Sequence, residues 1–455
     1  STEGRRNGML REDEPLRTYA ARWGVLAIYM LLGLTNQACW LTFSAVSKGA
    51  AARYEVTQDW ITAQTTTVTL MFLPGSWIVS RALAGRDGSL RRAVLIGAAF
   101  QATGSVVRWI GDVLVRPLNL RLAFAVVTFG QDLCALASPA FINTPATLAE
   151  DWFSIGEREP VLSAAIFSPI VGQGVGSASS GFLAGGPHAQ GMGKIITWQA
   201  IASVLLFILT WLFFRSKPPT SPVRTKHETP VETKVFVTWV RILRRPQFLL
   251  LLTIFDVGTA IGAGVLTLFS QFSGACGYTP GVAGLASGVY ILGGMVGALV
   301  SGSALGRTRA YRTCLRCTVA GALIAGTGWT ASLKPNAAGW VLTAMGAFGG
   351  CLMGVLPALI TNAVEETYPI PADACTSLLF LSANILQVAV TPAWQAVHNI
   401  EVNKCGGIFS PSRLFVIALA VFGCFLPMVG YRGECHRKLA EERMLQEARN
   451  MVQIS

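Results

Sequence analysis

The sequence predicts an all-α membrane protein whose twelve transmembrane helices form two six-helix bundles. Hydrophobic residues make up 52% of the 455 residues and charged residues only 13%, about half of the roughly 25% charged residues found in soluble domains. Apolar stretches of about 20 residues, the length that crosses a bilayer, recur along most of the chain. A polar segment over residues 215–246 divides these stretches six and six.

Each predicted span is an apolar stretch bounded by polar or turn-forming residues, with limits that are soft by several residues. The spans cover residues 22–47, 59–83, 93–115, 120–146, 160–184, 194–214, 247–272, 281–305, 312–333, 338–364, 374–397 and 411–431. The chain is therefore expected to comprise an N-terminal tail (1–21), a first bundle (22–214), a linker (215–246), a second bundle (247–431) and a C-terminal tail (432–455).

The net charge of +12 predicts membrane topology rather than a nucleic-acid partner. If both termini are cytoplasmic, about 27 of the 36 Lys and Arg residues fall in the tails, the linker and the loops on that side. We therefore expect a multi-pass protein with both tails and the linker in the cytoplasm. Whether it lies in the plasma membrane or in an organelle membrane stays open.

The two halves of the chain show weak internal symmetry. "SRALAGRDGSLRR" follows the second span and "SGSALGRTRAYR" follows the eighth, so each half has a basic, Gly-containing loop at the same place. Two related bundles of this kind are typical of transporters whose substrate site lies near the membrane midplane between the bundles. Asp87 and Arg91 in the first loop are candidate gating residues, whereas the second loop lacks the acidic residue.

The first span contains polar residues where lipid-compatible ones are expected, in "TNQACWLTFS". Trp40 lies about 25 Å of helical rise beyond Trp23, so it could belong to an aromatic belt at the outer membrane surface. Asn36 lies one turn before Trp40 on the same face, and this polar neighbour favours a cavity-facing surface instead. Gln37 is rotated away from that face and is expected to meet a neighbouring helix.

Several other spans carry polar groups that need partners in hydrocarbon. Gln173 in the fifth span and Asn384 in the eleventh would by default hydrogen-bond a neighbouring helix. Asp256 in the seventh is a candidate counter-ion, proton carrier or ion-pair partner, or else a neutral carboxyl bonded to a neighbour. Arg108 is expected to extend to the outer surface. Glu365 is a possible gating partner of the basic loop near residues 307–316.

Cysteine and nucleophile patterns argue against metal or covalent chemistry. Most of the ten cysteines lie in apolar spans, and only Cys276 and Cys405 fall in predicted outer loops, where they could pair in an oxidising compartment. The sequence contains no metal-ligand spacing, no nucleophile with an adjacent base and no phosphate-binding loop joined to a lysine. No enzyme activity, cofactor or metal is therefore expected.

Four segments carry a resemblance to a known family. "NQACWLTFSAVS", "FGQDLCALASPAFINTPATLAEDWF", "FSPIVGQGVG" and "MGVLPALITNAVEETYP" resemble the feline leukaemia virus subgroup C receptor-related group, solute carrier family 49 of the major facilitator superfamily. The similarity runs from the first span to the eleventh and suggests a divergent member. Members of that group are known or proposed to carry choline and ethanolamine, haem, or vitamin-like cations.

The resemblance implies a substrate site. Trp40 matches an aromatic residue that faces the substrate cation, Asn36 an Asn one turn before it, and Gln173 a Gln of the fifth helix. Asn384 occupies the position of a Gln in the eleventh helix. Phe255 replaces a tyrosine of the seventh helix, and the adjacent Asp256 could compensate by its charge.

The chemistry suits a cation independently, because a quaternary ammonium donates no hydrogen bond and is recognised by aromatic faces, each contributing about 0.5 to 2 kcal/mol. Haem fits less well, because its ligands are usually His, Cys, Met or Tyr. The four histidines lie in loops, the tail or helix ends, at His188, His227, His398 and His436.

The sequence therefore predicts an alternating-access transporter of a choline-like or ethanolamine-like cation or amine. Alternatives are a transporter of haem, another porphyrin, pyridoxine or thiamine, and a receptor or nutrient sensor that does not transport. The expected partners are a small-molecule substrate and the lipid bilayer, with no nucleic acid, and the protein is expected to be a monomer.

Overall fold

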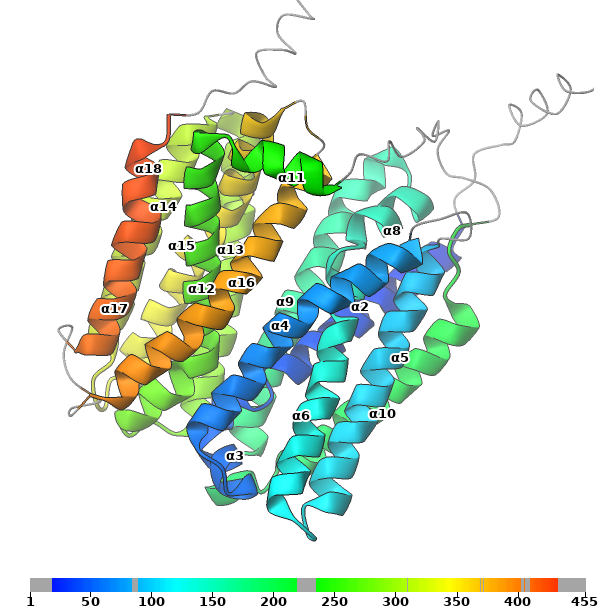
Figure 1. The fold of residues 1–455 in the computed structure, drawn as a ribbon, viewed down its shortest axis with the longest axis vertical. Coiled ribbons are helices and arrows are strands. Elements are labelled where there is room, and N and C mark those ends of the chain that lie inside the picture. Colours follow the sequence, from blue (N-terminus) through cyan, green and yellow to red (C-terminus); the bar gives the residue numbers. More distant parts are fainter. Residues whose placement is uncertain are drawn as a thin grey trace, which may run out of the picture.

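Two bundles of tilted helices stand side by side in the computed structural model, one built from each half of the chain (Figure 1). The structure describes residues 19–83, 89–218, 235–308, 310–368, 370, 372–401, 405 and 410–432. Half of the predicted linker and most of each predicted tail lie outside these residues, as does Asp87. Of the described residues, none forms a β-strand.

The N-terminal bundle contains the helical segments up to residue 213. They are α2 (Ala21–Trp40), the 3₁₀ turn η1 (Ser44–Val46), α3 (Ser47–Tyr54), α4 (Gln58–Leu83), α5 (Leu90–Trp109), the π-helix η2 (Ile110–Val115), α6 (Leu120–Ala137), α7 (Pro139–Ile142), α8 (Pro145–Trp152), α9 (Ile155–Leu183), η3 (Pro187–Ala189) and α10 (Met192–Phe213).

The C-terminal bundle follows the linker. Its segments are α11 (Val235–Leu243), α12 (Pro246–Ala275), α13 (Pro280–Thr308), α14 (Tyr311–Ser332), α15 (Ala338–Thr367), α16 (Ala372–Asn399), α17 (Pro411–Ala420), the π-helix η4 (Val421–Phe425) and α18 (Leu426–Gly430). The short helix α11 lies across one end of this bundle (Figure 1).

Local sequence signals start several helices. The side chains of Ser89 and Asn119 accept hydrogen bonds from the backbone N–H groups three residues further on, at 3.2 and 3.0 Å, and so cap α5 and α6. Pro246 and Pro411 occupy the first turns of α12 and α17, where the missing N–H of proline costs no intrahelical bond.

Ten helical segments in the described part of the chain are long and apolar enough to cross a membrane. They coincide with ten of the twelve predicted spans. The other two predictions, 59–83 and 312–333, correspond to α4 and α14, which have 26 and 22 residues but are more polar. The predicted all-α membrane fold is confirmed. Of the twelve predicted spans, ten correspond to described helices that are long and apolar enough to cross a membrane.

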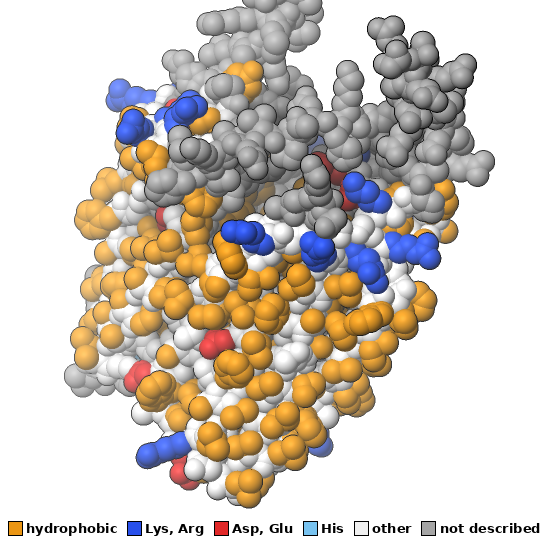
Figure 2. Space-filling model, turned by 45° about the vertical axis from the view of Figure 1, so that its right-hand side comes forward, with side chains coloured by type: hydrophobic (Ala, Val, Ile, Leu, Met, Phe, Trp, Pro, Cys, Tyr) orange, Lys and Arg blue, Asp and Glu red, His pale blue; other side chains and the backbone are white. Residues whose placement is uncertain are grey.

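The surface agrees with a membrane location. Figure 2 shows hydrophobic side chains over the body of the molecule, whereas most of the Lys and Arg side chains in view gather toward its upper end. Exposed tryptophans such as Trp198 and Trp211, which are 70% and 61% exposed on α10, belong to this apolar surface.

Within the C-terminal bundle, glycines let helices touch backbone to backbone. A Cβ atom on Gly293 or Gly297 of α13 would lie 2.2 or 1.8 Å from a carbonyl oxygen of α15, so no larger residue fits there. Such close approach is the usual basis of helix association in lipid.

Hydrogen bonds join the two bundles on the side of the molecule that carries α3. They run from Ser47 to Ser270 (3.0 Å), Gln271 to Thr62 (3.0 Å), Gln387 to Thr69 (3.1 Å) and Asn399 to Asp59 (2.8 Å), and Ser270 also donates to the backbone oxygen of Ser44. These contacts form a seam, defined by the residues just named, that closes one end of the space between the bundles.

Candidate substrate-binding site

Helix α2 breaks directly after Trp40. Residues 41–43 form a turn, η1 adds one 3₁₀ turn, and α3 then follows. The side chain of Thr42 donates to the carbonyl oxygen of Ala38 at 2.9 Å, and Gln131 of α6 donates to that of Cys39 at 3.0 Å, so side chains occupy carbonyl groups that the helix no longer uses. Trp40 thus stands at the end of a helix that is interrupted inside a predicted span, and interrupted helices are common at transporter substrate sites.

Trp40 itself lies between the two bundles. Its indole N–H donates to the backbone oxygen of Thr65 on α4 at 3.3 Å. Its ring and the fully buried Leu41 pack against the hydrophobic core of the C-terminal bundle. This placement puts Trp40 at the contact between the bundles rather than in a lipid-facing belt.

The amide of Asn36 is fully used inside the N-terminal bundle. Its nitrogen donates to Gln101 Oε1 at 2.7 Å and to the backbone oxygen of Cys134 at 2.8 Å. Its oxygen accepts from Ser138 at 2.7 Å and from Gln37 at 3.1 Å. Asn36, which is 3% exposed, therefore anchors the helix that carries Trp40.

Gln173 reaches the same helix through Gln37. The side-chain nitrogen of Gln173 donates to Gln37 Oε1 at 2.9 Å. Two glycines of α9, Gly172 and Gly176, permit this contact, because a Cβ on either would lie 2.2 Å from a backbone oxygen of α2. The structure thus joins the amides of Asn36, Gln37 and Gln173 into one chain, with Gln37 at its centre.

Asp256 and Phe255 lie on α12 and both contact α16. One carboxylate oxygen of Asp256 accepts a hydrogen bond from Ser382 at 2.8 Å. Phe255 is buried and meets Phe380 edge to face, with ring centroids 5.2 Å apart. Asp256 remains partly exposed, so a hydrogen bond to the neighbouring helix and a role toward substrate charge are compatible.

Asn384 hydrogen-bonds within its own helix. Its side-chain nitrogen donates to the backbone oxygen of Phe380, on its own helix, at 2.7 Å. No hydrogen bond between described residues joins Asn384 to Trp40 or Gln173. The amides of α16 that reach the first bundle are Gln387, through Thr69, and Asn399, through Asp59.

The candidate gating residues Arg91 and Glu365 lie close to the ends of helices. Arg91 donates to the backbone oxygens of Phe214 (2.7 Å) and Trp211 (2.9 Å), which ties the start of α5 to the end of α10. Glu365 is buried at the end of α15.

Cys276 and Cys405 form a disulfide between the end of α12 and the loop after α16.

Sequence reasoning missed Gln131, which donates to the carbonyl oxygens of both Cys39 and Trp40 (3.0 and 3.5 Å). It stands in "FGQDLC", within a predicted apolar span, so the criterion that selected Gln173 would also have selected it.

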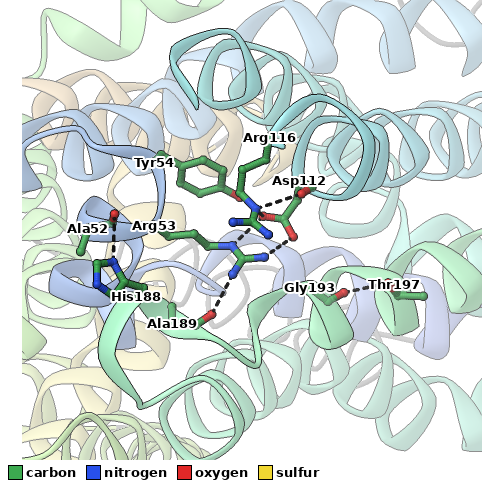
Figure 3. Close-up of polar contacts among 9 residues, drawn as sticks. All are labelled: Ala52, Arg53, Tyr54, Asp112, Arg116, His188, Ala189, Gly193 and Thr197. Carbon is green, nitrogen blue, oxygen red and sulfur yellow. Dashed lines mark hydrogen bonds and ion pairs between the residues drawn. The ribbon is translucent and has the colours of Figure 1, made fainter. Parts of the chain in front are cut away.

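A second missed group is an ion-pair cluster at the α3 end of the first bundle (Figure 3). Both oxygens of Asp112 accept from Arg53 at 2.7 Å, and the Tyr54 hydroxyl donates to one of them at 2.6 Å. Asp112 is fully buried. In the sequence, Asp112 stands near the end of a predicted span, where a charged residue indicates only that a loop begins.

Comparison with known proteins gives concordant results. Residues 25–392 match the family described as Major Facilitator Superfamily. The chain is 25% identical to solute carrier family 49 member A3 of Xenopus tropicalis, over 93% of this chain and 90% of that protein. It is 23% identical to the choline/ethanolamine transporter FLVCR2 of Homo sapiens, over 94% and 81%. These matches confirm the resemblance to solute carrier family 49.

Solved structures share the fold. The D-xylose–proton symporter superimposes with a TM-score of 0.67 at 12% identity, covering 89% of this chain and 97% of that one. A mutant of the nucleoside transporter NupG gives 0.66 at 10% identity, covering 90% and 100%.

Proposed function

The chain belongs to the Major Facilitator Superfamily, and on that premise we propose that it transports a small organic cation or amine, choline-like or ethanolamine-like, by alternating access. The family assignment makes it a multi-pass membrane transporter and not an enzyme. The named substrates of the similar FLVCR2 proteins, choline and ethanolamine, support the proposed substrate class.

The observation that carries the proposal is the position of Trp40, on the last turn of an interrupted helix and between the bundles. An indole ring attracts a quaternary ammonium through its quadrupole. The carbonyl end of α2 adds the partial negative charge of a helix C-terminus. A cation at Trp40 would therefore meet the field of the ring and part of the field of the helix end, where Gln131 already donates to the carbonyl oxygens of Cys39 and Trp40.

Other residues supply the polar part of the site. Asp256 offers a negative charge from the second bundle, and its partner Ser382 fixes one of its oxygens. Gln173, held by Gln37, offers an amide oxygen that can accept from a substrate hydroxyl or ammonium. Asn384 donates its side-chain nitrogen to Phe380, so its amide oxygen is the group that would accept from a substrate.

The seam at the α3 end supports one orientation of the cycle. If both termini are cytoplasmic, that end faces outward, and the described conformation would open its site toward the cytoplasm. Rocking of the bundles would then break the seam and close the end near α8 and α11.

A ligand panel tests the proposal. Choline, ethanolamine, haemin, pyridoxine and thiamine are added to the purified protein, and the thermal midpoint is measured for the unaltered chain, Trp40→Ala and the matched control Trp198→Ala, whose ring is 70% exposed. We expect choline or ethanolamine to stabilise the unaltered chain and the control but not Trp40→Ala. If only haemin or a vitamin stabilises the protein, the proposed substrate class is wrong and the stabilising compound indicates the substrate class instead.

Uptake of the stabilising ligand into proteoliposomes distinguishes a transporter from a receptor that binds the ligand without carrying it. A ligand that stabilises the protein but is not taken up would identify a receptor or sensor.

A further inference from the structure

Arg108 lies inside the N-terminal bundle, and its guanidinium nitrogens form no hydrogen bond with another described residue. It belongs to α5 and is 0% exposed, so the sequence-based prediction that it extends to the outer surface is wrong. Among the described residues, none of its three guanidinium nitrogens meets hydrogen-bond geometry with an acceptor, although the thiol of Cys39 lies close enough to interact with the guanidinium. A guanidinium keeps its charge in proteins and carries five N–H donors, and burying such a charge without an acceptor is strongly unfavourable.

The neighbouring carboxylate does not serve Arg108. Asp112, one turn further along, accepts from Arg53 with both oxygens and from Tyr54, and Arg116 lies 3.8 Å from the same carboxylate. The ion pairs between described side chains do not include Arg108. The carboxylate of Asp112 is therefore shared by Arg53, Tyr54 and Arg116, and no hydrogen bond or ion pair between described residues joins it to Arg108.

The surroundings of Arg108 are the broken stretch after α2. Its guanidinium lies over the ring of Phe43, 5.5 Å from the centroid. A Cβ on Gly130 of α6 would be 2.8 Å from Arg108 Cγ, so the side chain is enclosed by close backbone packing. One aromatic face attracts the charge but accepts none of the N–H groups in the guanidinium plane. The nearby thiol of Cys39 is at best a weak acceptor.

Other polar atoms around this stretch are also without hydrogen-bond partners in the part of the chain that the structure describes. They are Ser44 Oγ, Gln131 Oε1 and Gln199 Oε1. Ser44 follows Phe43 directly, Gln131 holds the last carbonyl groups of α2, and Gln199 bonds Thr42 through its nitrogen at 2.9 Å. Buried polar atoms in native proteins are rarely left unpaired. Of these three, only the Ser44 hydroxyl can donate to an anion, whereas the two amide oxygens only accept and would be paired by water.

We propose that Arg108 binds a small monovalent anion beside the break between α2 and α3. Arg108 carries the only uncompensated formal charge in the group just described, so the ligand must accept hydrogen bonds and be negative. The planar fork of a guanidinium suits a carboxylate or a halide ion.

The anion has two possible sources with the same chemistry. One is free halide. The other is the carboxylate of a zwitterionic substrate, because Trp40 stands directly before the break and Phe43, beneath Arg108, stands within it. The second source rests on the function proposed above: the ammonium end of the substrate would lie on Trp40 and the carboxylate end on Arg108.

A salt comparison tests the site without any assumption about transport. The thermal midpoint of the purified full-length protein is measured in chloride, bromide and gluconate at one ionic strength, for the unaltered chain, Arg108→Gln and the control Arg121→Gln, an exposed arginine at the same end of the bundle. We expect a saturable rise of the midpoint with chloride or bromide that Arg108→Gln abolishes and Arg121→Gln retains. Equal midpoints in all three salts, or a rise that persists in Arg108→Gln, would overturn the proposal in favour of internal water.

Should Arg108→Gln not fold, equilibrium binding of radiolabelled chloride to the unaltered chain decides the same question. One chloride per chain, displaced by bromide, is expected. If the unaltered chain shows saturable binding of neither chloride nor a carboxylate ligand, the proposed site is overturned.

A comparison of choline with glycine betaine distinguishes the two sources. Both carry a trimethylammonium group, but only glycine betaine adds a carboxylate. If the substrate supplies the anion, glycine betaine stabilises the protein in chloride-free buffer and Arg108→Gln removes that effect. If halide is the ligand, choline stabilisation adds to that of chloride and glycine betaine gives none. If neither trimethylammonium compound binds, the proposed function fails while the salt comparison still decides the anion site.

Discussion

Gln173 donates a hydrogen bond to Gln37 at 2.9 Å, and this contact joins the middle of α9 to the helix that carries Trp40. Gln37 in turn donates to Asn36. The amides therefore form one connected chain, and removing different members of it should have different effects.

We expect Asn36→Ala to destabilise the protein more than Gln173→Ala. Gln173→Ala removes one interhelical hydrogen bond, which in membrane proteins contributes about 0.6 kcal/mol and at most about 1.7. Asn36→Ala leaves the buried partners Gln101 and Ser138 unpaired as well. Unfolding in detergent measures both, with Thr343→Ala, an exposed hydroxyl bonded only to its own helix, as the control. A larger loss from Gln173→Ala would contradict the network.

Replacing Trp40 by Leu should weaken choline binding by a factor of about 2 to 30, the equivalent of 0.5 to 2 kcal/mol for one cation–π contact. Trp40→Phe keeps a ring and should lose less. Radioligand binding measures the series, with Trp198→Leu as the matched control. If the chains with Leu and with Trp at position 40 bind choline with equal affinity, the Trp40 ring does not contribute to the site.

Asp256→Asn should leave folding nearly unchanged, because an amide oxygen can still accept from Ser382. It should weaken cation binding, since the charge is lost. Uptake into proteoliposomes with and without a pH gradient, compared with Ser382→Ala, shows whether Asp256 also couples transport to protons. An unchanged pH dependence in Asp256→Asn would exclude the coupling role.

Loss of the disulfide should destabilise the second bundle. Cys276 and Cys405 are 129 residues apart in sequence, and removing a native disulfide typically costs about 2 to 5 kcal/mol. The double variant Cys276→Ser/Cys405→Ser should therefore unfold at lower temperature and become insensitive to reductant. Cys317→Ser, at an exposed free cysteine, should behave as the unaltered chain. A reductant effect that survives in the double variant would count against the pairing.

The ion-pair cluster of Figure 3 should respond more strongly to a single change than to a matched double one. Asp112→Asn leaves Arg53 buried without a counter-charge, which costs about 3 to 5 kcal/mol. Arg53→Met combined with Asp112→Leu removes both charges and should recover most of that loss. A double-mutant cycle by thermal unfolding measures it, and additive losses would show that the two charges act independently.

The positions of the helices follow from apolar run length alone. The predicted span 247–272 corresponds to α12 at Pro246–Ala275, and 194–214 to α10 at Met192–Phe213. The break after Trp40 could not be predicted in this way, because residues 41–46 contain neither Pro nor Gly. Contacts from Thr42 and from Gln131 on a distant helix stabilise it.

Partner choice is the least predictable part of the site. Asn36 and Trp40 share a face by spacing, yet Asn36 bonds into its own bundle while Trp40 packs against the other. The position of Arg108 in its span predicts that it reaches the surface, but the helical path continues to Val115 and Gly130 packs against the side chain. Both outcomes depend on which helix lies opposite, and one chain's sequence does not contain that information locally.

The seam between the bundles has a chemical character with a kinetic consequence. Its side-chain partners are hydroxyls and amides in Ser47–Ser270, Thr62–Gln271 and Thr69–Gln387, and the single carboxylate, Asp59, meets the neutral Asn399. Parting these described contacts separates no pair of opposite charges, and water can replace each bond as it breaks. The barrier to switching should therefore be nearly independent of the ionic strength of the medium.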